Sequence, residues 1–249
     1  MRTPKPVVLV TGAGRNLGRA IALEFARSGA DVAVNVRSDR AAADSVMAEI
    51  SALGGRACVQ VADVSDEHAV SEMFAQIAGT LGPVSVLVNN AGPRGEAGID
   101  ELTRGEWDQV IGAVLTGAFH CCRAAVPGMK QQRQGHIINV LGAIAHAGQA
   151  RRAHLAAAKS GVLGMTRALA VELGPFGITV NAVSPGPLDT PPPPGLDPEV
   201  RLQRAAHKPI ARLGGVDEVA AMVAYLASPS ASFITGQTIA VNGGEVMLG

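Results

Sequence analysis

Aromatic residues are scarce in this chain. Its 249 residues include one tyrosine and one tryptophan, and aromatics make up 3% of the total. Proteins that bind single-stranded nucleic acid stack its bases on aromatic side chains, so this scarcity disfavours such a partner. Basic and acidic residues are equal in number, 21 each, which leaves no net charge to attract nucleic acid or an anionic membrane. We expect no nucleic-acid and no membrane partner.

Cysteine is also scarce and is not arranged in pairs. The three cysteines, Cys58, Cys121 and Cys122, form no CxxC motif, so we predict neither a disulfide framework nor a metal site. No uninterrupted run of about 18 apolar residues is present, and the apolar segment that begins at Val7 is too short for a signal peptide. These features predict buried thiols in a reducing compartment and a cytoplasmic location.

Hydrophobic residues are abundant, at 47% of the total, and they lie in short runs separated by helical patterns. The run at residues 7–10 is apolar throughout, as expected for a parallel strand buried on both faces. This alternation predicts an α/β fold: a single doubly wound, Rossmann-type domain over residues 1–249, with a seven-stranded parallel sheet and helices on both faces. Further strands are predicted at 32–36, 57–61, 84–88, 136–141, 178–183 and 237–241, and helices at 19–28, 39–53, 66–81, 106–132 and 152–173.

The proline-rich stretch at residues 191–195 interrupts this alternation. The strand–helix pattern does not restart after it as a new unit. We therefore predict a loop or substrate lid at about residues 188–212 on the same domain, rather than a linker between two domains.

A glycine-rich loop, Thr11-Gly12-Ala13-Gly14-Arg15-Asn16-Leu17-Gly18, lies between the first predicted strand and the first predicted helix. Glycine lets the backbone turn tightly and approach a pyrophosphate, whose charge is stabilised by the positive end of the helix. A glycine-rich loop in this context favours a dinucleotide site.

Further motifs then follow in a fixed order. They are Asp63-Val64, Asn89-Asn90-Ala91-Gly92, Trp107-Asp108, Lys159, Asn181, Pro185-Gly186, and an ending that runs from Arg212-Leu213-Gly214 to Gly243-Gly244. With the glycine-rich loop, these motifs strongly resemble the short-chain dehydrogenase/reductase family over essentially the whole chain. The resemblance is more specific for the fold than for the activity. It also implies a small-molecule substrate and a homo-oligomer, a tetramer or a dimer.

The resemblance implies a cofactor site, position by position. The glycine-rich loop would shape the pyrophosphate turn, Asp63-Val64 would hold the adenine, and Pro185-Gly186 would contact the nicotinamide end. Asn16 stands where the family usually has its middle glycine, and the loop should persist because asparagine tolerates a left-handed backbone. The implied cofactor contacts are Gly12, Arg15, Asn16, Leu17, Gly18, Arg37, Ser38, Asp63, Val64, Asn89, Ala91, Gly92, Lys159, Pro185, Gly186 and Thr190.

The end of the second predicted strand indicates which cofactor is bound. Proteins that bind NAD place an acidic residue there to hold the ribose hydroxyls. In this chain Val36 occupies that position and is followed by Arg37 and Ser38, while Arg15 lies in the glycine-rich loop. Two guanidinium groups and a hydroxyl suit a 2′-phosphate, so we predict NADP(H). The alternative is that Arg37 is a solvated loop charge.

Three of the four residues of the family's usual proton relay are missing. By the resemblance, a tyrosine exchanges a proton with the substrate, a lysine four residues later assists it, a serine positions the carbonyl and an asparagine holds a water. The four-residue spacing places the tyrosine and lysine positions on one helix face. These positions hold Leu155, Lys159, Gly142 and Val114, respectively. Leucine, glycine and valine carry no titratable group, so the relay cannot operate in its usual form.

Other residues are candidates for the substrate pocket. His146 follows the Gly142 turn, Arg94 follows Gly92, and His207 lies in the predicted lid. His146 is the candidate replacement for the missing acid, because an arginine orients a substrate but is a poor proton donor. The predicted pocket comprises Arg94, Val114, Gly142, His146, Leu155 and His207.

Three more polar residues lie just before Leu155. His154 is rotated by about 100° from Leu155 round the helix and need not face the pocket. Arg151 and Arg152 point toward Leu155 only if the helix begins that early. The single tyrosine, Tyr225, lies far along the fold and is interpreted as structural.

Three functions are consistent with this sequence. The preferred one is an NADP(H)-binding oxidoreductase of atypical mechanism, which transfers hydride to an activated acceptor, such as an imine or a conjugated system, without a tyrosine acid. An apolar pocket around Leu155 suits a substrate that is apolar in part. The alternatives are a non-redox enzyme on the same fold, such as a cyclase, dehydratase or isomerase, and a catalytically silent cofactor-binding or partner protein.

Overall fold

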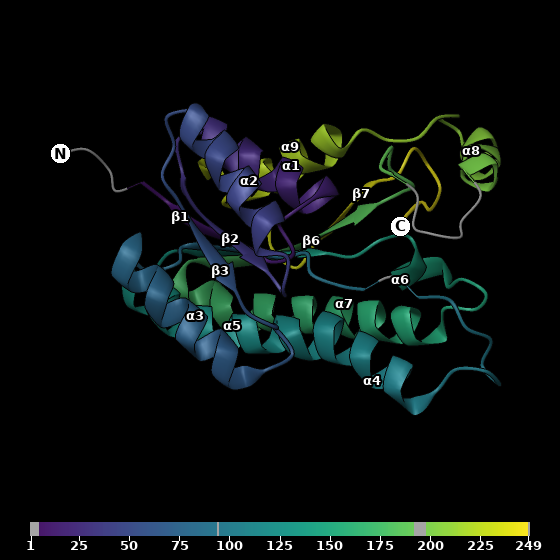
Figure 1. The fold of residues 1–249 in the computed structure, drawn as a ribbon, viewed down its shortest axis with the longest axis horizontal. Coiled ribbons are helices and arrows are strands. Elements are labelled where there is room, and N and C mark those ends of the chain that lie inside the picture. Colours follow the sequence, from purple (N-terminus) through teal and green to yellow (C-terminus); the bar gives the residue numbers. More distant parts are fainter. Residues whose placement is uncertain (1–4, 94, 192–197, 249) are drawn as a thin grey trace.

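One parallel sheet organises the chain (Figure 1). The structure is a computed structural model that describes residues 5–93, 95–191 and 198–248. Its sheet has seven strands in the order β3-β2-β1-β4-β5-β6-β7, and every neighbouring pair is parallel. The predicted fold class is confirmed. The strands are β1 (Val7–Val10), β2 (Asp31–Val36), β3 (Ala57–Val61), β4 (Val86–Asn89), β5 (Gly135–Val140), β6 (Ile178–Pro185) and β7 (Thr238–Val241).

Helices cover both faces of this sheet. Figure 1 shows α1, α2 and α9 on one face and α3, α5 and α7 on the other, with α8 at the edge of the molecule. The helices are α1 (Asn16–Arg27), α2 (Arg40–Ala52), α3 (Glu67–Thr80), α4 (Arg104–Ile111), α5 (Gly117–Gln132), α6 (Ile144–Ala147), α7 (Ala153–Leu173), α8 (Pro198–Ala206) and α9 (Val216–Leu226), with the shorter turns η1 (Gly112–Thr116), η2 (Gly174–Phe176) and η3 (Pro229–Ala231).

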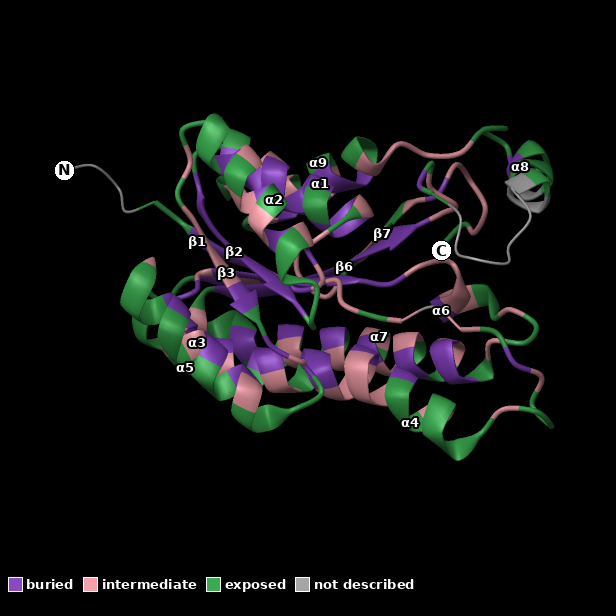
Figure 2. Ribbon diagram, in the orientation of Figure 1, coloured by how far each residue is buried: buried purple, intermediate pink, exposed green. Residues whose placement is uncertain are grey.

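The central strands read as continuous apolar runs because both of their faces are covered. Every residue of β1, β2, β4 and β6 is buried (Figure 2). Within β1, Val8 and Val10 belong to the core formed with α1, α2 and α9, whereas Val7 and Leu9 belong to the core formed with α3, α5 and α7. Each such side chain contributes about 1.5–3 kcal/mol of hydrophobic stabilisation.

The helix boundaries depart from the predicted ones by more than one residue at two places. Helix α1 begins at Asn16, inside the glycine-rich loop, rather than at residue 19. The predicted helix 106–132 consists of α4, the π-helical turn η1 and α5, and it begins at Arg104 because Thr103 and Glu106 form a capping box. Hydrophobic periodicity predicts that a helix is present, but it predicts neither the capping residues nor a single π-helical turn.

The winding of the sheet reverses between β1 and β4, and two polar side chains join these strands there. Thr11 Oγ1 accepts hydrogen bonds from the backbone amides of Asn90 and Ala91, both at 3.0 Å. The Asn90 side-chain amide donates to the carbonyls of Thr11 and Gly12, at 2.9 and 3.1 Å. In open α/β sheets this reversal opens a crevice at the carboxyl ends of the strands, where ligands bind.

Within the described part of the chain, the helical run Arg104–Gln132 is long and apolar enough to cross a membrane by length and composition alone. His120 and Arg123 interrupt it, so it is not the continuous apolar run sought in the sequence. Its α5 part packs against β4 and β5. Core helices commonly pass the same test, so this run is weak evidence for a membrane span.

A series of hydrogen-bonded, buried polar side chains runs from β4 through β5 to α7, beside the crevice at the carboxyl ends of β1 and β4. Asn139, on β5, has no exposed surface; it accepts a 2.8 Å hydrogen bond from the Asn89 amide and donates a 2.9 Å one to Thr166 Oγ1 on α7. Thr166 in turn donates to the Val162 carbonyl. Most buried polar groups in protein cores are hydrogen-bonded in this way.

We predict that Asn139→Ala lowers the free energy of unfolding by about 1–3 kcal/mol, because it leaves the Asn89 amide without its buried acceptor. Urea denaturation measures the change. Ser51→Ala is the control: its exposed hydroxyl bonds the Met47 carbonyl within α2, and its loss should cost less than about 0.5 kcal/mol. Equal losses for the two variants would contradict the structural role of this series of polar side chains.

Candidate functional site

The glycine-rich loop is shaped by close backbone contacts that exclude side chains. A Cβ on Gly18 would lie 2.2 Å from the Gly12 carbonyl oxygen, and one on Gly12 would lie 3.0 Å from Ala91 Cα. Gly12 also has a positive φ of 64°, which favours glycine. Asn16 has φ 49°, the left-handed conformation that its sequence position requires.

The same loop presents the start of α1. Its capping residue, Arg15, has extended backbone and makes no hydrogen bond from its side chain to the first helical turn. The N-terminal amides of a helix carry a partial positive charge and bind anions when a glycine-rich backbone allows close approach. The residues present therefore fit a pyrophosphate.

Basic side chains border the loop at the end of β2. A Cβ on Gly14 would lie 2.9 Å from Val36 Cγ1, so the loop packs directly on the last residue of the strand. Arg15, Arg37 and Ser38 are all exposed there. The neighbouring carboxylate, Asp39, caps α2 by accepting from the Ala42 amide. The edge of the loop therefore offers two guanidinium groups and a hydroxyl.

The turn after β3 is held in place by α5. Asp63 Oδ1 accepts hydrogen bonds from the amide and hydroxyl of Ser65, at 2.9 and 2.7 Å. His120 Nδ1, on α5, lies 3.1 Å from the Val64 carbonyl, and α5 approaches the turn through Gly117. The role of His120 was not predicted, because no motif links a histidine on a helix to a turn far earlier in the chain.

Asn89 turns its amide group into the protein. Its Nδ2 donates to Asn139 Oδ1 and lies 3.5 Å from Cys122 Sγ, while its Oδ1 is buried and has no hydrogen-bond partner among the described residues. Asn89, Thr11, Val114 and Cys121 line a cavity of about 10 Å³, room for about one water. Burial raises the pKa of Cys122 to about 12, so this thiol stays protonated at neutral pH.

The four positions at which the resemblance implies a proton relay lie near one another. Leu155, on α7, is 8% exposed and packs in an apolar cluster that includes Val114 and Leu141. Lys159 Nζ donates a 2.6 Å hydrogen bond to the Val140 carbonyl at the end of β5. Gly142 follows two residues later with φ 135°, a conformation that other residues rarely adopt. The only ionisable side chain of the four is the lysine.

The backbone at Val114 is irregular. Val114 lies in η1, where the Gly117 amide donates to the Gly112 carbonyl in π-helical geometry. A Cβ on Gly92 would lie 2.9 Å from Val114 Cγ2, so the Asn89–Gly92 turn packs against this irregularity. Single π-helical turns are frequent at functional sites. Sequence periodicity did not predict this one.

The other pocket candidates lie at different distances from the apolar cluster. His146, on α6, is partly buried; burial and then the nearby Arg167 cation lower its pKa, and its Nε2 has no hydrogen-bond partner among the described residues. A lowered pKa leaves less protonated imidazole at neutral pH, so these surroundings give no support for His146 as the acid. His207 is exposed after α8. Arg94 lies outside the described residues.

The residues just before Leu155 face a neighbouring loop. Arg151 pairs with Glu101 at 2.8 Å, and Arg152 pairs with Glu96. His154 is 2% exposed, and its Nε2 would lie 3.4 Å from a Cβ on Gly95. The two arginines are therefore tied to residues 96–101 by ion pairs.

Tyr225 lies on α9, across the sheet from α7 (Figure 1).

Comparisons with known proteins identify the family to which this chain belongs. The family model described as enoyl-(acyl carrier protein) reductase matches residues 12–245. The 3-oxoacyl-[acyl-carrier-protein] reductase FabG of Staphylococcus aureus (strain Mu50) is 41% identical over 239 residues, which cover 96% of this chain and 97% of that protein. The chain belongs to the short-chain dehydrogenase/reductase family. It is an oxidoreductase of that family.

Two further similarities agree with membership of the short-chain dehydrogenase/reductase family. Nodulation protein G of Azospirillum brasilense is 38% identical over 238 residues, 96% of this chain and 97% of that protein. A crystal structure from Sinorhizobium meliloti 1021, described as a short-chain alcohol dehydrogenase, superposes with a TM-score of 0.93 at 33% identity and covers 98% of this chain and 97% of that one.

We predict that Gly117→Ala lowers the free energy of unfolding by about 1–3 kcal/mol, because its Cβ would lie 2.6 Å from Val64 Cγ2 and would push α5 off the turn. Gly128→Ala on the same helix is the matched control. A Cβ there has Pro83 Cβ, at 4.0 Å, as its nearest neighbour, so helix propensity should raise stability by up to about 1 kcal/mol. Urea denaturation compares them, and a change of the same sign in both would disprove the close contact.

Proposed function

We propose that this chain is an NADP(H)-dependent oxidoreductase of atypical mechanism, which reduces an activated small-molecule acceptor, an imine or a conjugated system, without a tyrosine acid. The observation that carries the proposal is the combination of a complete pyrophosphate cradle with a buried leucine, Leu155, at the tyrosine position beside Lys159. Bound NADPH would supply the hydride. The chain's own residues must bind, orient and desolvate the acceptor.

The loop geometry supports the proposed cofactor contacts. The cradle of Gly12 and Gly18 and the amides that begin α1 bind the pyrophosphate. Arg15, Arg37 and Ser38 bind the 2′-phosphate through charge-assisted hydrogen bonds, which distinguishes NADP(H) from NAD(H). The remaining contacts are the Asp63-Val64 turn, the Asn89–Gly92 turn, Lys159, Pro185, Gly186 and Thr190.

The acceptor side explains why an activated substrate is needed. Leu155, Val114 and Gly142 supply no proton, so a simple ketone would develop an alkoxide with no acid beside it. An iminium becomes a neutral amine once it gains hydride, and a conjugated carbonyl becomes an enolate that takes its proton from water. Lys159 provides a positive charge near the end of β5 that stabilises such an anion. The apolar walls favour a substrate that is apolar in part.

We propose further that the protein acts as a homo-oligomer, a tetramer or a dimer, in the cytoplasm, without a nucleic-acid or membrane partner. Exposed apolar side chains support the assembly. Phe119 on α5 and Val171 on α7 are 46% and 81% exposed, and Phe233 and Met247 are exposed near β7.

We predict that NADPH binds more tightly than NADH and that Arg37→Gln weakens NADPH binding about tenfold or more while leaving NADH binding unchanged. Fluorescence titration of each nucleotide measures both affinities. Arg40→Gln is the matched control, because Arg40 is also exposed nearby but pairs with Asp44 on α2 at 3.6 Å. Tighter binding of NADH to the unaltered protein would overturn the cofactor assignment.

We predict that Leu155→Tyr confers reduction of a 3-oxoacyl thioester, the substrate class named for the relatives, whereas Leu155→Phe does not. The two variants match in size and differ in the hydroxyl, which should raise the rate about 100-fold or more. Gly142 is left unchanged because its φ of 135° strains any side chain. NADPH oxidation with acetoacetyl-coenzyme A provides the measurement, and imine and enone acceptors test the unaltered protein.

The outcomes separate the candidate functions. If the unaltered protein reduces the thioester as fast as Leu155→Tyr does, the proposed loss of the acid is refuted. If protein stripped of nucleotide still converts a substrate to product, the chain is a non-redox enzyme. Binding of NADPH without oxidation by any acceptor would indicate a silent cofactor-binding protein.

A further inference from the structure

A buried ion pair joins two segments that lie far apart in the sequence. Lys208 follows α8, and its side chain is 5% exposed; its Nζ lies 3.1 Å from Glu245 Oε2, whose side chain is 20% exposed. A surface pair of the same chemistry, Lys130 with Glu172, is 34% and 61% exposed and longer, at 3.6 Å. Burying an ammonium group is costly unless a partner compensates its charge.

Glu245 belongs to a tight turn at residues 242–246, here called the 242–246 turn. Gly243 and Gly244 have positive φ angles of 65° and 83°. Asn242 closes the turn from both sides: its Oδ1 accepts from the Gly244 amide at 3.0 Å, and its Nδ2 donates to the Val246 carbonyl at 2.9 Å. These hydrogen bonds fix the backbone that carries Glu245.

The 242–246 turn is packed between two other segments. On one side, Ile210 donates its amide to the Gly243 carbonyl at 3.0 Å, and a Cβ on Gly244 would lie 2.7 Å from Pro209 Cγ. On the other side, a Cβ on Gly186 would lie 2.9 Å from Asn242 Cα. Any shift of the turn therefore moves both Gly186 and the segment after α8.

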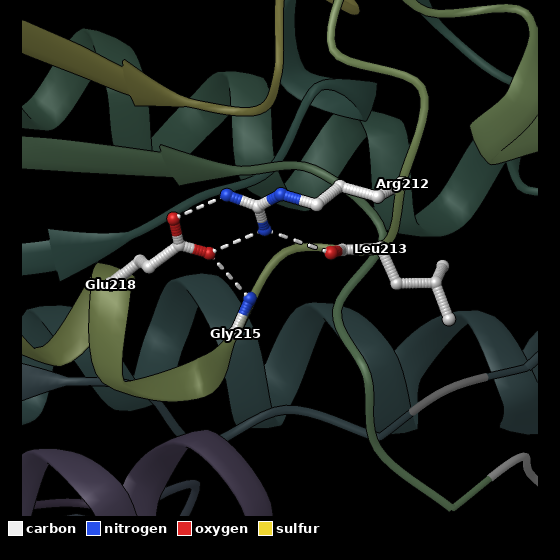
Figure 3. Close-up of polar contacts among 4 residues, drawn as sticks. All are labelled: Arg212, Leu213, Gly215 and Glu218. Atoms are coloured by element: carbon white, nitrogen blue, oxygen red, sulfur yellow. Dashed lines mark hydrogen bonds and ion pairs between the residues drawn. The ribbon is translucent and has the colours of Figure 1, made fainter.

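The segment that follows α8, residues 208–212, has a second anchor at its far end. Figure 3 shows Arg212 on Glu218, with hydrogen bonds of 2.8 and 2.7 Å, and Glu218 also accepting from the Gly215 amide. The hydrogen bonds from Arg212, and to a smaller extent the one from Gly215, lower the pKa of Glu218 to about 2. Between α8 and residues 211–213 lies a cavity of about 430 Å³. The segment is thus held on the 242–246 turn through residues 208–210 and on Glu218 through Arg212.

We infer that the Lys208–Glu245 pair is a positioning device: it locks the 208–212 segment onto the 242–246 turn and thereby sets the position of Gly186. The pair contacts no reacting atom. The inference rests on the proposed function only in the role of Gly186 at the nicotinamide end of the cofactor. Loss of the pair loosens the 208–212 segment locally and speeds release of NADPH.

Hydrogen exchange of the full-length protein without nucleotide tests the lock. Glu245→Gln strands the buried ammonium, so amides in residues 205–212 should exchange about tenfold faster or more, while those of α7 keep their rates. Lys208→Met removes the positive charge and should also speed exchange at residues 205–212. Lys208→Arg keeps the positive charge and should leave exchange slow. Glu172→Gln, the same change in the surface pair, should alter nothing. Unchanged exchange at 205–212 in both Glu245→Gln and Lys208→Met would overturn the inference.

Release of NADPH, followed by stopped-flow fluorescence, tests the consequence for the cofactor. We expect release about threefold faster or more from Glu245→Gln and Lys208→Met, and an unaltered rate from Lys208→Arg and Glu172→Gln. A release rate that stays constant while exchange rises would overturn the link to Gly186. If the unaltered protein binds no NADPH, the proposed function fails, and the exchange experiment still decides whether the pair locks the segment.

Discussion

Two side chains, Thr11 and Asn90, hold together the strand ends on which the proposed cofactor site is built. Their hydrogen bonds join β1 to β4 where the winding of the sheet reverses. The close contacts of Gly12 and Gly18 depend on this junction, because Gly18 packs against both the Gly12 carbonyl and the Asn90 amide. The site is made largely of backbone, whose placement follows from the sheet.

A cradle made of backbone can persist when catalytic side chains change. Leu155 and Val114 lie in an apolar cluster between α7 and the π-helical turn, where their burial adds hydrophobic stabilisation. Lys159 keeps a structural partner in the Val140 carbonyl. The same fold can therefore carry different chemistries at this site.

The sequence predicted the sheet, the glycine-rich loop and the left-handed Asn16, because each depends on local residue type and spacing. It did not predict the π-helical turn at Val114 or the contact of His120 with the Val64 carbonyl. It also left open where Arg151 and Arg152 point, and the structure pairs them with acidic residues of another loop. Such contacts depend on which distant segments become neighbours, which periodicity does not encode.

The sequence by itself determined the fold class and the family, because alternating hydrophobic runs and ordered motifs are local properties of the chain. Tertiary structure alone decided that Leu155 is buried against Val114 and that Lys208 meets Glu245. It also decided that Asn89 turns its amide inward to Asn139. The reason is physical: burial and the pairing of charge depend on distances through space, and these are set only when the sheet and its helices have packed together.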